Sequence, residues 1–195
     1  MRYFILFICG ATVSISALAE VRTGIDADVQ LPFWELRVPG MTLRLVQRLP
    51  DQTRAFFMAR GFSAAQAEQI AQSCVFQTIY KNTAQASSPL VIEYDLTQWQ
   101  VAHNGKIGQL KVREIWRTQW QQQQILPAAA IAFEWSLLPT RQTYKANDYN
   151  WGMTSFNLPP GSHFDLRLRW RENGVAKSAQ MEHLECAADI HPQPD

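Results

Sequence analysis

The chain has 195 residues, of which 47% are hydrophobic, and it carries 18 basic and 17 acidic side chains. This hydrophobic content excludes disorder for most of the chain, and the balanced charge gives no electrostatic footprint for nucleic acid or an anionic membrane. The length fits a single domain with its own hydrophobic core.

Residues 1–19, MRYFILFICGATVSISALA, have the features of a secretory signal peptide. Arg2 precedes a mostly apolar run, and Ala17-Leu18-Ala19 is a small-x-small pattern that signal peptidase accepts. The apolar run is too short and too interrupted by small polar residues for a membrane anchor, which needs roughly 20 residues. We expect cleavage after Ala19, which removes Arg2 and leaves 17 basic and 17 acidic residues. The mature protein is then periplasmic or secreted and has no membrane span.

Two cysteines, Cys74 and Cys186, remain after residue 19. In an oxidising compartment they predict one disulfide that joins distant parts of the fold. A redox or metal pair would normally show close spacing such as CxxC, which is absent here.

The mature chain, residues 20–195, is predicted to form one domain that begins with a short strand near Met41. A helical hairpin is expected over residues 50–74. Its first helix ends at Gly61, and its second opens with a capping box formed by Ser63 and Gln66. A β-sandwich over residues 75–186 and a flexible tail over 187–195 complete the domain.

Three segments of the predicted sandwich alternate apolar and polar side chains, as strands on a core do: residues 90–97, 131–138 and 163–170. This pattern buries Trp135 and Trp170. Asn104-Gly105 and Asn173-Gly174 predict tight hairpin turns. Residues 106–124 fit either a helix or a strand.

These elements predict a mainly β, α+β domain, in which an immunoglobulin-like antiparallel β-sandwich follows the helical hairpin. The piece LPPGSHFDLRLRW, residues 158–170, resembles the proline-glycine turn and following strand of many immunoglobulin-like periplasmic domains. The resemblance concerns the fold and names no function.

Motifs that name a reaction are absent: we find no G-x-S-x-G elbow, no phosphate-binding glycine loop and no H-E-x-x-H pair. Ser162 and His163 are adjacent and therefore point to opposite faces of a strand. Glu93 and Asp95 share a strand face, which suits a solvated surface better than an acid pair. The sequence therefore assigns no catalytic residue.

Met181 and His183 are two residues apart on a predicted strand, so they should share a face. Thioether and imidazole ligands suit Cu(I), which makes copper the one cofactor to consider. Three further side chains could complete such a set: His163, Met153 and Met41. The inward face is claimed by the neighbouring Leu184 and Cys186, so the pair is expected on a sheet surface.

Seven tryptophans are present, and four lie where no regular pattern buries them: Trp34, Trp116, Trp120 and Trp151. Such rings gathered at strand ends would suit a partner surface or a sugar platform. Polar residues that could flank a sugar are Asn147, Asp148, Asn150 and residues 121–124.

The stretch NDYNWGMTSF, residues 147–156, leads into a turn at residues 158–161, where paired prolines end any strand. Gly152 indicates a bulge or a close backbone approach. Our hypothesis is that Tyr149, Trp151 and Met153 border a binding surface, and the alternative is that they plug the core. The expected function is that of an exported periplasmic binding or accessory domain that contacts a protein partner or a small ligand. A copper-handling module and an enzyme of unrecognised type are the alternatives.

Overall fold

The computed structural model describes residues 19–190. Apart from Ala19, the predicted signal peptide lies outside the described residues, and so do residues 191–195 of the predicted tail. Within the described part, no helix is long and apolar enough to cross a membrane.

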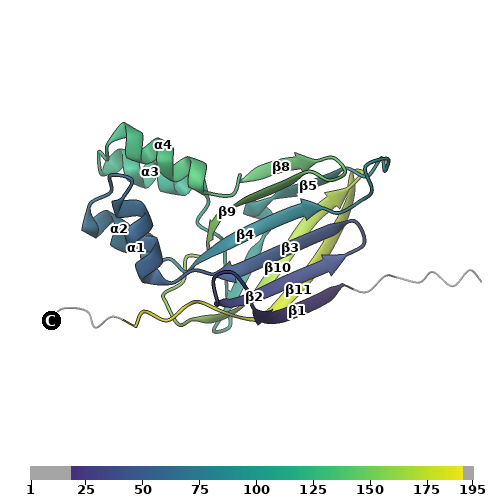
Figure 1. Cartoon of the computed structure of the whole chain (residues 1–195), viewed down its shortest axis with the longest axis horizontal. Helices are drawn as coiled ribbons and strands as arrows, with labels where there is room; N and C mark the ends of the chain where they lie inside the picture. The colour runs from purple at the N-terminus through teal and green to yellow at the C-terminus, as the bar shows by residue number, and fades with distance from the viewer. Residues whose placement is uncertain (1–18, 191–195) are drawn as a thin grey trace, which may run out of the picture.

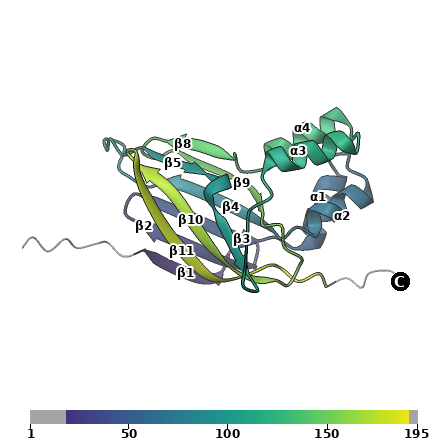
Figure 2. The ribbon, with the colours of Figure 1, turned by 180° about the vertical axis from the view of Figure 1, so that it is seen from behind.

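Two antiparallel sheets pack face to face (Figures 1 and 2). Sheet A has the order β1 (Glu20–Ile25), β2 (Pro32–Val38), β3 (Met41–Gln47), β4 (Val75–Asn82) and β9 (Tyr149–Ser155). Sheet B contains β5 (Ile92–Asp95), β6 (Gln100–His103), β7 (Lys106–Gly108), β8 (Arg141–Tyr144), β10 (His163–Glu172) and β11 (Val175–Glu185). β10 is central in sheet B, because it pairs with β11 along one side and with β5 and β6 along the other. The predicted mainly β, α+β sandwich is thus confirmed, whereas its immunoglobulin-like character stays a prediction.

Two helical pairs lie together at one end of the sandwich and form what we call the helical lobe (Figure 1). The first pair, between β3 and β4, is the predicted hairpin, with α1 (Pro50–Met58) and α2 (Ala64–Ala71); three strands of sheet A precede it. Its capping box is present, since Ser63 Oγ accepts from the Gln66 amide at 3.3 Å and Gln66 Oε1 accepts from the Ser63 amide at 2.9 Å. The second pair, between β7 and β8, is α3 (Arg113–Gln122) and α4 (Pro127–Ser136). Residues 106–124 therefore contain both a short strand and a helix.

The strand predicted over residues 131–138 is wrong, because most of this segment belongs to α4. Pro127 stands at the first helical position and an alanine run follows, both of which favour a helix. The helix buries Ala129 and Phe133, one turn apart. Trp135 then points away from this face and is 86% exposed, so its predicted place in the core is also wrong.

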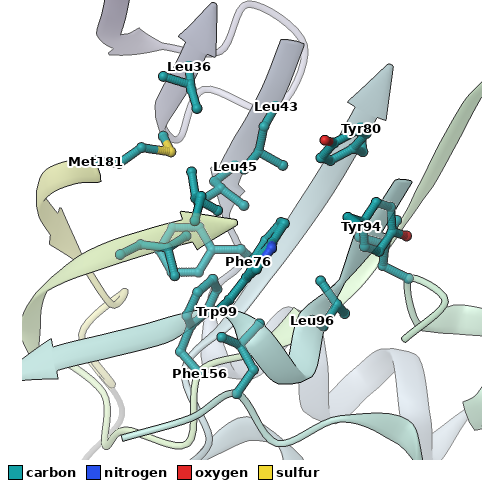
Figure 3. Packing of buried hydrophobic residues seen from close by; sticks show 14 of the residues in the cluster. Leu36, Leu43, Leu45, Phe76, Tyr80, Tyr94, Leu96, Trp99, Phe156 and Met181 are labelled. Carbon is teal, nitrogen blue, oxygen red and sulfur yellow. The ribbon is translucent and has the colours of Figure 1, made fainter. Parts of the chain in front are cut away.

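The main core lies between the two sheets (Figure 3). Phe76 of β4 packs edge-on against Phe156, with ring centroids 5.3 Å apart, and Trp99 donates a hydrogen bond to the Arg169 carbonyl at 3.1 Å. The predicted apolar faces of β5 and β10 are confirmed, since all of these residues are buried: Ile92, Tyr94, Leu96, Phe164, Leu166, Leu168 and Trp170.

A second core fills the helical lobe. Trp116 and Trp120 of α3 stack with their ring centroids 5.0 Å apart, and Phe57, Phe62 and Phe133 surround them. Trp34 is buried as well, in the main core. These three tryptophans therefore stabilise the fold and do not form a sugar platform.

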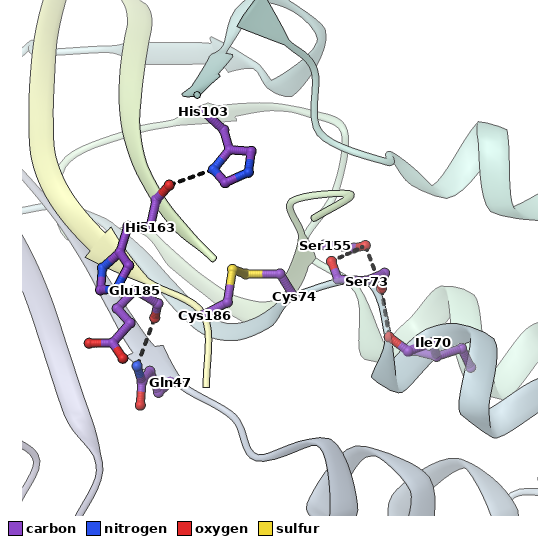
Figure 4. The surroundings of a disulfide bond; sticks show 9 residues. All are labelled: Gln47, Ile70, Ser73, Cys74, His103, Ser155, His163, Glu185 and Cys186. Atoms are coloured by element: carbon purple, nitrogen blue, oxygen red, sulfur yellow. Dashed lines mark hydrogen bonds between the residues drawn. A yellow bond between two sulfur atoms is a disulfide. The ribbon is translucent and has the colours of Figure 1, made fainter. Parts of the chain in front are cut away.

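Cys74 and Cys186 form the predicted disulfide, with a Cα–Cα distance of 5.3 Å (Figure 4). It joins the residue that precedes β4 to the residue that follows β11. Nearby, Ser155 Oγ hydrogen-bonds Ser73 Oγ at 2.8 Å, and the side-chain Nε2 of Gln47 donates to the Glu185 backbone carbonyl at 2.7 Å (Figure 4). Sheet A, the helical lobe and the end of β11 are thereby joined at one point.

Beyond the disulfide, the chain stays in contact with the fold as far as Asp189. Arg54 of α1 pairs with the Asp189 carboxylate and, at 2.5 Å, with Glu68 of α2. The first residues of the predicted tail are thus held against the helical hairpin.

Both predicted hairpin turns are confirmed. Asn104 and Gly105 have φ values of 48° and 73° between β6 and β7, and Asn173 and Gly174 have 48° and 80° between β10 and β11. Positive φ at both central residues is what the tight turn between twisted strands requires.

Candidate functional site

β9 carries the predicted binding residues on the outer face of sheet A, away from the main core. Tyr149, Trp151 and Met153 stand opposite residues 81, 79 and 77 of β4. Tyr149 is 59% and Trp151 is 68% exposed, whereas Met153 is buried against the helical lobe. Trp151 is therefore not part of a core, as the alternative interpretation required, whereas Met153 is.

Gly152 provides the close backbone approach that the sequence indicated. A Cβ atom at this position would lie 2.4 Å from the Leu138 nitrogen and 2.7 Å from the Leu137 carbonyl carbon. The Leu138 amide also donates to the Met153 carbonyl at 2.9 Å. Only glycine lets the backbone of Leu137 and Leu138, which follow α4, approach β9 this closely, and this approach brings α4 beside Trp151.

A groove of about 540 Å³ lies at the corner between the helical lobe and sheet A. α4 contributes Trp135 and Ser136 to its wall, and β9 contributes Trp151. The remaining lining residues come from α1 and its flanks, from α4, and from β4 and β9: Arg48, Phe56, Arg60, Ala132, Gln77 and Met153. Two strongly exposed tryptophans thus border one concave site, and exposed aromatic rings of this kind are typical of binding surfaces.

Arg48 and Arg60 flank α1 and give the groove its charge. Their guanidinium carbons lie 4.9 and 3.3 Å from the centre of the Phe56 ring. Burial lowers the pKa of the Arg48 guanidinium, and the nearby positive charge of Arg60 lowers it further. Within residues 19–190, neither arginine forms an ion pair.

Two buried nitrogen atoms among the lining residues have no hydrogen-bond partner in the described part of the chain: Nε of Arg48 and Nε2 of Gln77. Buried donors are almost always paired, and leaving one unpaired costs about 1–3 kcal/mol. Because both groups are donors, the groove is suited to a ligand that offers oxygen acceptors, and the two arginines favour a negative charge on it.

The predicted copper pair does not share a face. Met181 is fully buried in the main core, whereas His183 is exposed. The register of β10 and β11 shifts between Phe164 and Leu166, and His183 has a φ of 57°, so a bulge breaks the alternation on which the prediction depended. Buried Met41 and Met153 lie in two different cores.

His103, His163 and His183 border one surface depression together with Asp165. His103 Nδ1 is 2.6 Å from the His163 carbonyl oxygen and not from its ring (Figure 4). Among residues 19–190, no group of three or more histidine, cysteine or acidic side chains is placed to hold a metal ion.

The acidic and serine–histidine candidates are explained by local contacts. Ser162 is buried while His163 is exposed, as expected for neighbours that face opposite ways. Asp95 forms an ion pair with Arg141 of β8 at 2.7 Å.

No protein family model, no curated protein and no solved structure matches this chain. Of the residues that line the groove, the sequence indicated Trp151 and Met153 and missed Arg48, Arg60 and Trp135. One available signal was the spacing of Phe56 and Arg60, which are four apart and so share a helix face. Another was Pro127 followed by alanines, which would have turned Trp135 outward on a helix.

Proposed function

We propose that the protein is an exported binding domain and that the groove between the helical lobe and sheet A binds an anionic ligand with an apolar or aromatic body. The observation that carries the proposal is the joint presence of two exposed tryptophans and two arginines that form no ion pair with any residue the structure describes. The guanidinium groups would bind the anionic group, and Trp135 and Trp151 would contact the apolar body.

Binding is a better account of this groove than catalysis. Among the described residues that line it there is no histidine, cysteine or carboxylate, so it offers no general base and no activated nucleophile. The two buried groups of its lining that have no partner within residues 19–190, Nε of Arg48 and Nε2 of Gln77, are donors, which recognise an acceptor and hold it in place.

The proposed compartment is the periplasm or the exterior of the cell. The Cys74–Cys186 disulfide supports export, because such bonds persist in oxidising compartments. The predicted signal peptide supports the same proposal from the sequence. Recovery of the protein from a periplasmic fraction with an intact mass that begins at Glu20 tests it, and protein that retains residues 1–19 after export would contradict the predicted cleavage.

The groove can be tested with a pair of matched probes, anionic 8-anilinonaphthalene-1-sulfonate and neutral N-phenyl-1-naphthylamine. We expect the anionic probe to bind at least about tenfold more tightly, because a hydrogen bond to a charged group contributes roughly 1.5–3 kcal/mol. Arg48→Gln with Arg60→Gln should remove this preference. The control is Arg167→Gln with Arg169→Gln, which changes the net charge equally on the exposed side of β10.

Equal affinity of the two probes would contradict the proposal. An anion preference that survives in the Arg48/Arg60 variant, or that falls by the same factor in the Arg167/Arg169 variant, would contradict it as well, since net charge alone would then explain the binding.

A further inference from the structure

β9 is an edge strand of sheet A, and only one half of its free side is covered. On that side, the Met153 carbonyl accepts from the Leu138 amide and the Ser155 carbonyl accepts from the Lys111 amide, both at 2.9 Å. Residues 153 and 155 therefore turn their backbone groups away from β4.

The direction of the backbone groups alternates along a strand, so Tyr149 and Trp151 turn theirs to the same free side. Consistent with this, Asp148 and Phe156, at the ends of β9, hydrogen-bond the β4 side through Asn82 and Cys74. In the described part of the chain, neither the amide nor the carbonyl of Tyr149 or Trp151 has a partner on the free side. Such an open edge is able to pair with another extended chain.

The open edge leads directly into the groove, because Trp151 belongs to both. Beyond Trp151 the edge is closed by Leu137 and Leu138 at the end of α4. A chain that pairs with residues 149–151 must therefore leave the edge of β9 beyond Trp151. From this point it can continue into the groove on the outer face of sheet A, where Arg48 and Arg60 lie.

We propose that the ligand is an acidic segment of another protein, which binds in an extended conformation. It adds a short strand to β9 at residues 149–151 and places a carboxylate side chain between the groove's arginines and Gln77. This inference rests on the proposed function and names the class of its ligand. A second copy of this chain that paired through its own β9 would bring two more arginines to the same place, so charge repulsion disfavours that occupant.

The experiment begins with affinity selection from a library of blocked octapeptides, read out by mass spectrometry. The peptide selected is then made in three further forms. Two carry N-methyl groups on alternate backbone nitrogens, in the two opposite phases, and the third has its carboxylates replaced by amides. In a strand that is paired on one edge, only one phase of amides is bonded, so we expect one N-methylated form to lose at least about tenfold in affinity and the other to keep it.

On the protein side, Tyr149→Pro removes the free amide at the first residue of β9, where proline does not disturb the pairing with β4. Tyr149→Ala is the matched control, because it removes the same side chain and keeps the amide. We expect the proline variant to bind the peptide about three- to tenfold more weakly than the alanine variant, in line with one lost hydrogen bond. Circular dichroism should show both variants folded. Arg48→Gln should lower the affinity for the acidic peptide more than the affinity for the form whose carboxylates are replaced by amides.

Equal binding of both N-methylated forms would overturn strand addition and leave the groove's function standing. Selection of no acidic peptide while the anionic naphthalene probe still binds would overturn the peptide class alone. Failure of both peptide and probe would overturn the proposed function itself. Self-association of the protein that is lost in the Tyr149→Pro variant would replace the peptide with a second copy as the occupant.

Discussion

Replacing Gly152 with alanine should destabilise the protein, because the backbone of Leu137 and Leu138, just after α4, lies directly against β9 at this residue. The added methyl group would lie 2.4 Å from the Leu138 nitrogen, 2.7 Å from the Leu137 carbonyl carbon and 2.8 Å from the Leu138 Cα. All three obstructing atoms are backbone atoms, so no side-chain rotation relieves the overlap. The end of α4 must move away from β9, and the hydrogen bond between Leu138 and Met153 is strained with it.

The magnitude follows from two opposing effects. Overpacking a well-packed core costs typically about 1–3 kcal/mol, and the rigid backbone contact places this substitution at the upper end. Alanine also has less conformational freedom than glycine in the unfolded chain, which stabilises the folded state by about 0.4–1 kcal/mol. We therefore expect the free energy of unfolding to fall by about 2–3 kcal/mol, which corresponds to a melting temperature lower by about 4–12 °C in a domain of this size.

Gly108→Ala is the matched control, because Gly108 also lies in a strand and its added methyl group would meet only the Val101 carbonyl oxygen at 3.9 Å. Urea unfolding followed by circular dichroism compares the two variants with the parent, with the slope of the transition checked for constancy. The control should match the parent or exceed it slightly. If Gly152→Ala unfolds at the same urea concentration as Gly108→Ala, the close approach of Leu137 and Leu138 to β9 is wrong.

Three other predictions concern stability. Trp151→Ala should leave the free energy of unfolding within about 1 kcal/mol of the parent, because the Trp151 residue is 68% exposed. Trp116 is fully buried, so Trp116→Ala should lower the free energy of unfolding by about 3–5 kcal/mol. Equal losses in urea unfolding would contradict this assignment of the two rings. Replacing both disulfide cysteines with alanine opens a loop of 112 residues, for which the chain-entropy model predicts a loss of about 4–5 kcal/mol, and an unchanged urea midpoint would refute it. A hydrogen bond from Arg44 lowers the pKa of the Asp26 carboxyl group in the folded protein. The ionised carboxylate therefore stabilises the fold fully at pH values above about 3.9, the pKa of an aspartate in the unfolded chain. This stabilisation is lost as the pH falls through the lower pKa of the folded state. Asp26→Asn should therefore reduce stability at pH 7 and have little effect at pH 2, and an equal loss at both pH values would count against the ion pair.

Elements with strong local signals could be predicted from the sequence. Three kinds of feature depend only on residues close together in the chain: the capping box at Ser63, the two asparagine-glycine turns, and the alternation of apolar and polar side chains in β5 and β10. The disulfide was predictable for another reason, since only one pair of cysteines, Cys74 and Cys186, follows the predicted signal peptide. These features required no knowledge of which distant segments meet.

Predictions from the alternation of apolar and polar side chains failed in two places. In one the same residues also fitted the repeat of a helix, and in the other a bulge interrupted the strand. Residues 131–137 alternate apolar and polar side chains, yet Phe133 and Ala129 also fit one face of a helix, and packing against α3 selected the helix. In β11, the bulge at His183 turned Met181 inward. Trp116 and Trp120 gave no clear burial signal, because the surface that buries them comes from other helices.

The groove itself was decided by tertiary structure. Trp151 could be proposed as a binding residue from its unusual neighbours, but its partners Arg48, Arg60 and Trp135 come from segments far away in the chain. They meet because the two helical pairs pack into one lobe and because Gly152 lets the residues that follow α4 pack closely against β9. Sequence spacing does not encode such a meeting, since the free energy that stabilises it comes from the shared core of the lobe and not from the groove residues themselves.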